Sequence, residues 1–223
     1  MRLTEADHAR VTAAVAEAER STDGEIVTVV ARQSDAFHDV ALHWAVLAML
    51  LVLTLFAVWP QAVEWLYGWG GDAWTTAVPL RALFTIALIA VAATFLLVRL
   101  LLAATPLRMA LTPPATKARR VRRRAVELFR ASAEQRTRAR TGVLLYLSLD
   151  ERRAEIVADE AIHSKVAPET WGEAMAALVE AVREGRPGEG MAAAVTRIGA
   201  VLAKHFPRSE DDVNELPDRL IEL

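Results

Sequence analysis

Two long runs of uncharged, mostly apolar residues constrain this chain more than any other feature. The chain carries no charge at 44–63 or at 82–98, and arginines bracket the second run. About 20 apolar residues in a helix cross the hydrocarbon core of a bilayer, and flanking arginines can extend to the head groups. The rest of a 223-residue chain is too small to bury two such helices. We therefore expect a transmembrane hairpin with spans at about 41–62 and 80–103.

The segment between the two runs, about 64–80, is rich in aromatic residues. Amphipathic rings of tryptophan and tyrosine are enriched at membrane interfaces. We therefore expect an interfacial loop that carries Trp65, Tyr67, Trp69 and Trp74, with Trp59 just before it.

Basic residues flank the hairpin on the side of both termini. Cytoplasmic segments close to membrane spans are enriched in lysine and arginine. We therefore predict a multi-pass protein of the inner (plasma) membrane with both termini in the cytoplasm. A cleaved signal peptide is not expected, because the first apolar run begins only around residue 41. The flanking cations are Arg2, Arg10, Arg20 and Arg32 before the hairpin and Arg108, Lys117, Arg119, Arg120, Arg122 and Arg123 after it.

The residues outside the hairpin predict one cytoplasmic domain built from two pieces, 1–39 and 104–207. In the first piece, Thr4 and Asp7 resemble a capping box before an amphipathic helix, and 25–31 is rich in β-branched residues and predicts a strand. One helix and one strand bury too little surface to fold alone. They must pack on the second piece.

The second piece supplies the remaining elements of an α/β domain. The pattern predicts a long basic helix over about 115–140, an almost wholly apolar strand at 142–149 and a hairpin partner at 154–158. Two amphipathic helices follow and end near Gly185 and Pro207. This order of elements predicts an α/β fold with a small mixed sheet, interrupted by the two-helix hairpin.

Several stretches together resemble one protein family. They are DGEIVTVVAR before the hairpin, ELF in the basic helix, TGVLLYLSLDERRAEIVADEAIHSKV, a Trp171-Gly pair and GEGMAAAVTRIGAVLAKHFP. The chain resembles the membrane-inserted branch of the TPM-domain family, relatives of the thylakoid lumen 18.3-kilodalton protein. The resemblance implies an α/β/α sandwich, an acid phosphatase activity and a calcium site in some soluble members, and a role in assembling or maintaining membrane complexes.

This sequence departs from the soluble members of that family in two places. It lacks their acidic segment ahead of the first helix, and it has Ala158-Asp-Glu-Ala161 where they carry a glycine-rich turn. The chain also contains no cysteine, P-loop, GxSxG or HExxH motif, which excludes the chemistry those groups perform. We therefore lean against an enzyme and expect no cofactor. Only the resemblance to the family implies a divalent metal such as calcium.

The remaining candidates for catalysis are Asp159, Glu160 and His163. Glu160 and His163 have the Glu-x-x-His spacing of helical metal sites, but such sites need further carboxylates from other helices. An N-terminal helix cap by Asp159 accounts for the same residues without chemistry. No metal ligand is assigned.

The basic segment, 104–140, is the stronger candidate for binding. It carries eleven lysines and arginines against two acids. Three interpretations remain open: a topology signal on a solvated helix face, contact with anionic lipid, and nucleic acid, which is least favoured because no aromatic residues are interleaved with the charges. The candidate lipid- or partner-binding residues are Arg119, Arg120, Arg122, Arg123 and Arg124.

The last residues, 208–223, form an acidic tail with six carboxylates against two arginines. The composition suits a disordered solubilising end, or a segment that competes with lipid for the basic helix. Taken together, the sequence predicts a membrane-anchored module that binds anionic lipid or a membrane protein partner. The alternatives are a metal-assisted phosphatase acting on phosphomonoesters and a purely structural subunit of a larger complex.

Overall fold

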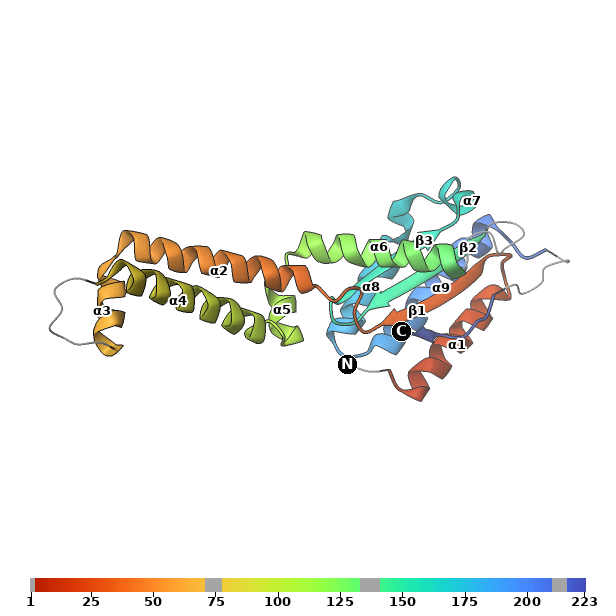
Figure 1. Ribbon diagram of the computed structural model, residues 1–223. Helices are drawn as coiled ribbons and strands as arrows, with labels where there is room; N and C mark the ends of the chain where they lie inside the picture. The colour runs from red at the N-terminus through yellow and green to blue at the C-terminus, as the bar shows by residue number, and fades with distance from the viewer. Residues whose placement is uncertain (1–2, 71–77, 133–140, 210–215) are drawn as a thin grey trace. The chain divides into compact units, whose positions relative to one another are not determined.

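The computed structural model describes residues 3–70, 78–132, 141–209 and 216–223. The chain divides into two compact units (Figure 1). The α/β unit contains Met1–Ala36 and Pro113–Leu223, and the helical unit contains Phe37–Thr112. An inserted pair of long apolar helices therefore interrupts an α/β domain, which confirms the fold class predicted from the sequence.

A small mixed sheet forms the centre of the α/β unit. Its strand order is β3-β2-β1-β4. β1 pairs with β2 and β4 in parallel, and β2 pairs with β3 antiparallel. Every residue of β1 and β2 is buried, as expected for central strands covered on both faces. The strands are β1 (Glu25–Ala31), β2 (Gly142–Ser148), β3 (Arg153–Ala158) and β4 (Ile221–Glu222).

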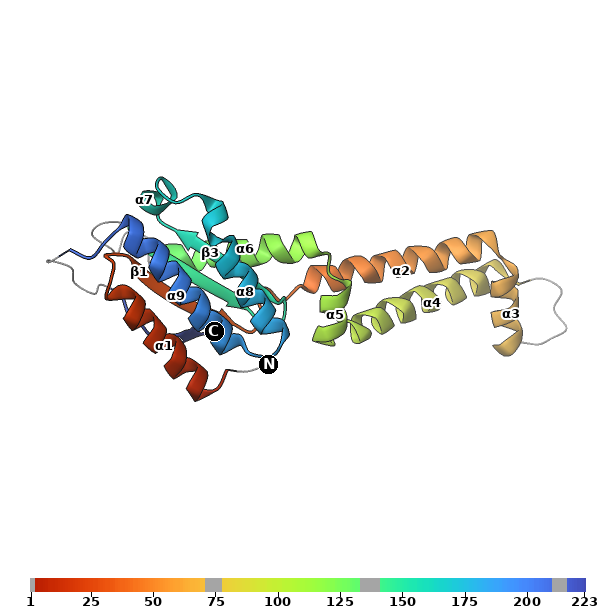
Figure 2. The same ribbon diagram turned by 180° about the vertical axis from the view of Figure 1, so that it is seen from behind.

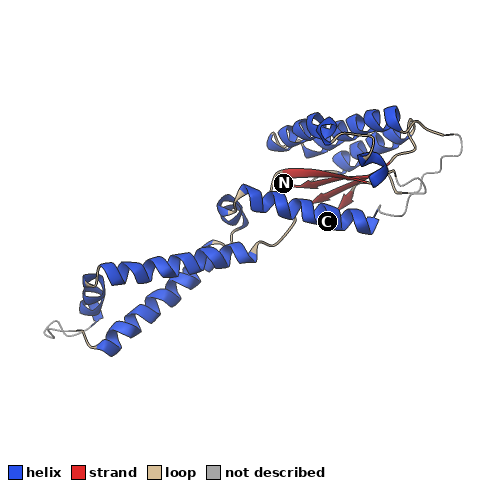
Figure 3. Ribbon diagram, turned by 90° about the horizontal axis from the view of Figure 1, so that it is seen from above, coloured by secondary structure: helices blue, strands red, loops and turns tan. Residues whose placement is uncertain are grey.

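Helices cover both faces of this sheet, so the unit has three layers (Figure 3). Helices α1 (Glu5–Glu19), α8 (Gly172–Arg183) and α9 (Pro187–His205) cover one face, which is seen in Figure 2. Helix α6 (Pro114–Ser132) packs on the other face through Val121, Ala125 and Phe129. Helix α6 was predicted to continue to about 140, but 133–140 lies outside the described residues. Two short elements, α7 (Glu160–His163) and η1 (Pro168–Trp171), connect β3 to α8.

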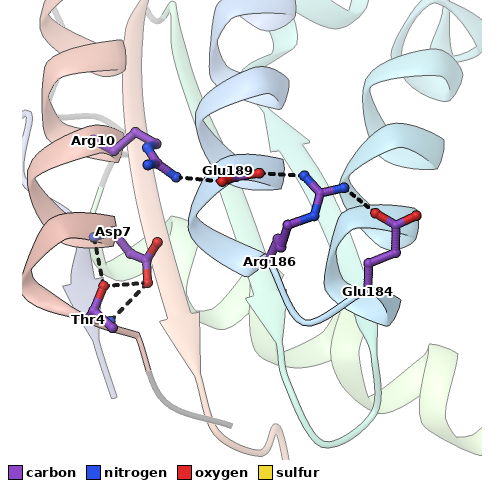
Figure 4. Close-up of polar contacts among 6 residues, drawn as sticks. All are labelled: Thr4, Asp7, Arg10, Glu184, Arg186 and Glu189. Carbon is purple, nitrogen blue, oxygen red and sulfur yellow. Dashed lines mark hydrogen bonds and ion pairs between the residues drawn. The ribbon is translucent and has the colours of Figure 1, made fainter.

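Helix α1 begins with the predicted capping box (Figure 4). The Asp7 amide donates to the Thr4 hydroxyl at 3.2 Å, and the Thr4 amide donates to the Asp7 carboxylate at 3.0 Å. Two donors that the helix would leave unsatisfied are thus paired. The bonds that the Asp7 carboxylate accepts from the Thr4 amide and hydroxyl hold the pKa of Asp7 below its usual value.

The contact between α1 and α9 depends on small residues and on ion pairs. A Cβ added at Gly199 would lie 2.5 Å from the Cβ of Ala18, so no larger residue fits without movement. Near the start of α9, Arg10 pairs with Glu189 at 3.2 Å, and Arg186 pairs with both Glu189 and Glu184 (Figure 4). These charged groups are exposed, so we assign the stability of the contact to the packing rather than to the ion pairs.

The described part of the acidic tail is ordered against β1. Leu216 and Leu220 are buried, and the Leu216 amide donates to the Glu25 carboxylate at 3.2 Å. Residues 221–222 then add β4 to the sheet. Burial raises the pKa of nearby Glu19 to about 8, and the Glu25 and Asp218 carboxylates add to this effect. The interpretation of 208–223 as a disordered end is therefore wrong for 216–223.

The helical unit contains the two apolar helices and two short ones. Helix α2 packs along α4, and each is long and apolar enough to span a membrane. The predicted interfacial loop is wrong for its first part, because Gln61–Gly70 forms a helix. Trp74 lies outside the described residues. The helices are α2 (His38–Val58), α3 (Gln61–Gly70), α4 (Leu80–Leu101) and α5 (Thr105–Leu111).

Candidate functional site

The carboxyl ends of the parallel strands β1 and β2 lie at the same end of the sheet. In open α/β sheets, ligands usually bind beyond the carboxyl ends of the strands. Three segments meet here: 32–36 after β1, 149–153 after β2, and the first half of α6. This end of the sheet is therefore the natural place for a site.

Polar bonds join the segment after β1 to the turn after β2. The buried Glu151 carboxylate accepts bonds from the Ser34 amide at 2.8 Å and from the Ser148 hydroxyl. The Ser34 hydroxyl also lies 3.0 Å from the hydroxyl of Tyr146, whose pKa is raised by burial. Glu151 and Tyr146 thus have structural partners, and they fix the position of the turn.

Four of the five candidate arginines on α6 form ion pairs within the α/β unit. Asp35 pairs with Arg120 at 3.3 Å and with Arg123 at 3.1 Å. Arg122 lies 3.6 Å from Glu155, whose pKa is raised by burial against the opposing effect of Arg122. Arg123 and Arg124 also contact Glu127 at 3.7 and 3.6 Å, whereas Arg119 is exposed and forms no ion pair with any described residue.

A cleft of about 700 Å³ opens beside the turn after β2. Its walls come from the start of α6, the turn, the start of β3 and helix α8. Glu180 pairs with Arg183 at 3.5 Å, and Glu151 accepts bonds only from neutral donors, so the cleft keeps four cations against two carboxylates. The charged residues that line the cleft are Lys117, Arg152, Arg153 and Arg183 against Glu151 and Glu180. The cleft is therefore suited to an anion.

Arg152 occupies an unusual backbone conformation at this cleft. Its φ is 50°, in the left-handed region, and its amide donates to the Leu149 carbonyl at 3.2 Å to close the turn. For a residue with a Cβ this region costs about 1–2 kcal/mol, and glycine is the usual occupant of such turn positions. The Arg152 side chain is exposed and forms no ion pair with the described residues. Strained positions that point a charge at a cleft are often functional.

Comparison with known proteins identifies the domain that contains this cleft. Residues 105–201 match the sequence model of the TPM domain. The chain carries a TPM domain. The matched range begins in α5 and ends in α9, and it leaves out α1, β1 and β4.

A solved structure supports the fold of the TPM domain and its surroundings. The NMR structure of the BA42 protein from the psychrophilic bacterium Bizionia argentinensis aligns with a TM-score of 0.56 and 17% identity. The alignment covers 100% of this chain and 97% of the other. At this identity the similarity shows the fold alone. A search of curated proteins found no match.

The candidate catalytic residues lie elsewhere in the TPM domain, beyond the end of β3. Asp159 is buried, and its carboxylate accepts a bond from the Gly142 amide at 3.0 Å. Asp159 is the N-cap residue of α7, as predicted, but its side chain makes no capping hydrogen bond there. Glu160 and His163 are exposed on α7. Among the described residues no three acidic or histidine side chains form a group that would hold a metal.

Sequence patterns alone did not identify the cleft in the TPM domain. Lys117 was named only as a flanking cation, Arg153 lies between two predicted strands, and Arg183 lies near the end of a predicted helix. The best available clue was the tight turn Asp150–Arg153, which contains no glycine or asparagine.

Proposed function

We propose that this protein is an integral membrane protein of the membrane-inserted branch of the TPM family, anchored by α2 and α4. One observation carries this proposal. Helix α4 has a mean hydropathy of 2.4 over an 18-residue window, yet none of its residues is buried. Helix α2 is similar, with 17% of its window buried.

The alternative, a soluble helical pair, is physically costly. A core helix of a soluble protein is apolar because neighbouring elements cover it, and each large side chain left in water costs about 1.5–3 kcal/mol. Leu88, Leu96 and Leu100 on α4 are each about two-thirds exposed or more. A bilayer removes this cost, whereas contiguous apolar surface of this extent is rare on monomeric soluble proteins.

The distribution of cations supports a cytoplasmic location for both termini. Lysines and arginines cluster on the terminal sides of the hairpin, and the chain from 37 to 80 contains none. The positive-inside rule predicts this arrangement for a hairpin with its turn outside. Reporter fusions within 64–80 and at the C-terminus test this topology, and reporters on the same side of the membrane contradict it.

We further propose that the TPM domain acts as a binding module for anionic lipid head groups, through the cleft beside the turn after β2. Three features support this use. The cleft holds more cations than carboxylates, and Lys117 and Arg152 form no ion pairs with described residues. The cleft also includes Pro114, close to Pro113, where the chain re-enters the α/β unit from the hairpin. Only a short length of chain, from Leu101 at the end of α4 to Pro114, therefore separates the cleft from the proposed membrane span.

The α6 arginines have a secondary part in this proposal. Their ion pairs with Asp35, Glu127 and Glu155 neutralise much of the charge that the sequence suggests. Arg119, which forms no ion pair with any described residue, adds to the attraction to an anionic bilayer. Each cation close to an anionic bilayer contributes about 1 kcal/mol.

Hydrogen exchange of the full chain in nanodiscs tests the head-group proposal. We expect the amides of 149–153 to be more protected in discs with phosphatidylglycerol than in discs of phosphatidylcholine alone. The double variant Lys117→Gln/Arg152→Gln should lose this difference. Arg20→Gln is the control, because Arg20 is the C-cap residue of α1, does not line the cleft and has a side chain that is 71% exposed. Equal protection in both kinds of disc would contradict the proposal.

The competing functions predict different results. A metal-assisted phosphatase would hydrolyse a generic phosphomonoester in the presence of divalent ions, and would lose this activity on replacement of Asp159 and Glu160. A structural subunit or a module for a protein partner would co-purify with one fixed membrane protein in mild detergent, regardless of the cleft variants.

A further inference from the structure

A second cavity lies within the helical unit, where α3 meets the start of α4. Its volume is about 490 Å³, within the range of small-molecule sites. Most of its wall is apolar, and Tyr67, Arg81 and Thr85 supply the polar groups. The lining residues are Leu66, Tyr67, Pro79, Arg81, Ala82, Thr85 and Ile86.

Arg81 is a lone cation in an apolar setting. No other lysine or arginine occurs between Arg32 and Arg99. Its guanidinium forms no ion pair within the described part of the helical unit, although Glu64 lies on the neighbouring α3. The Thr85 hydroxyl is already used, since it donates to the Arg81 carbonyl at 2.8 Å. The guanidinium therefore has donors available for an anion.

Exposed aromatic side chains set the depth of this cavity in a membrane. Trp65 and Trp69 on α3 are 61% and 81% exposed, and their rings lie 5.1 Å apart. Tryptophan concentrates at the level of the lipid head groups. Leu66 and Tyr67 line the cavity from the same helix, so membrane insertion would place the cavity at the level of the lipid head groups.

We propose that this cavity binds one anionic phospholipid. This inference rests on the proposed membrane insertion and is independent of the cleft in the TPM domain. The lipid phosphate contacts the Arg81 guanidinium, and the first part of an acyl chain lies against Leu66 and Ile86. Charge complementarity selects anionic lipid, because the head group of a zwitterionic lipid carries its own cation.

Native mass spectrometry of the full chain in mild detergent tests the proposal by counting bound lipids. The background is Lys117→Gln/Arg152→Gln, which removes the proposed cleft site. We expect one phosphatidylglycerol to bind more tightly than phosphatidylcholine. Arg81→Gln should weaken this binding about fivefold, the effect of losing one cation near anionic lipid. Arg99→Gln is the control, since Arg99 lies near the other end of α4 and does not line the cavity.

Ala82→Leu provides an independent measurement, because the larger side chain narrows the cavity and leaves Arg81 intact. It should weaken binding as Arg81→Gln does, and excess inorganic phosphate should not displace the lipid. Equal losses in Arg81→Gln and Arg99→Gln, tight binding by Ala82→Leu, or displacement by phosphate would each overturn the proposal. Release of the wild-type chain from membranes by alkaline washing would instead refute membrane insertion, so the two failures are distinguishable.

Discussion

Replacement of Arg152 should separate the stability of the TPM domain from its binding of anions. At φ 50° the folded state with arginine is destabilised by about 1–2 kcal/mol relative to glycine. Glycine in turn loses about 0.5–1 kcal/mol more conformational entropy on folding, because its unfolded chain is more flexible. Arg152→Gly should therefore raise the free energy of unfolding by about 0.7 kcal/mol. Arg152→Gln keeps the cost of the left-handed conformation and should change stability little.

Amide hydrogen exchange of β2 in the full chain measures this difference. The five tryptophans of the helical unit would obscure the fluorescence of Trp171, whereas β2 peptides report the α/β unit alone. In buried strands the slowest exchange follows the free energy of unfolding. A gain of about 0.7 kcal/mol slows exchange about threefold. Arg152→Asn should fall between glycine and glutamine, because asparagine tolerates this region better than most residues.

The affinities of the three Arg152 variants for anionic lipid should not follow the order of their stabilities. All three variants remove one cation from the cleft and should weaken binding to phosphatidylglycerol equally, about fivefold. If Arg152→Gly exchanges no more slowly than Arg152→Gln, the assignment of strain to this turn is refuted. If the loss of binding follows stability instead of charge, the role of the guanidinium is refuted.

Three further predictions concern the α/β unit and use the same exchange measurement. Glu19 has a pKa of about 8 in the folded protein against its usual 4.5, so the stability of the wild-type chain should fall as pH rises from about 5 to 8. At pH 9 the Glu19→Gln variant should be more stable than wild type by about 2 kcal/mol, a value reduced because Glu19 is only partly buried. Gly199→Ala should destabilise by about 1–2 kcal/mol, because its Cβ would meet Ala18. Leu216→Ala should cost about 2–4 kcal/mol and increase exchange at β1.

Local patterns were enough to predict most of the α/β unit. Thr4 and Asp7 form the expected capping box, and 25–31 forms the expected strand, because capping and β-branched runs depend on residues close in sequence. The buried face of α6 follows from the same local rule, since helical spacing places Val121, Ala125 and Phe129 on one side of the helix.

Elements that depend on distant contacts were missed. β4 has only two residues in an acidic tail, and it forms because Leu216 and Leu220 are buried by segments far away in the sequence. Helix α3 was predicted as loop, because its tryptophans favoured an interfacial position without indicating a helix. The cleft was missed for the same reason, since Lys117 and Arg183 meet the turn after β2 only in the folded unit.

The charges of α6 show why a count of arginines overestimates a binding surface. Asp35 lies next to the point where the chain leaves the α/β unit, and Arg120 and Arg123 follow its return. Together with the 2.9 Å bond from the Asp150 amide to the Arg32 carbonyl, these ion pairs join segments on either side of the inserted helices. Because the entropy cost of closing a loop grows only with the logarithm of its length, the inserted hairpin adds little to the cost of pairing β1 with β2. These arginines therefore support the fold, whereas the proposed anion binding depends on Lys117 and Arg152, which form no ion pairs with described residues.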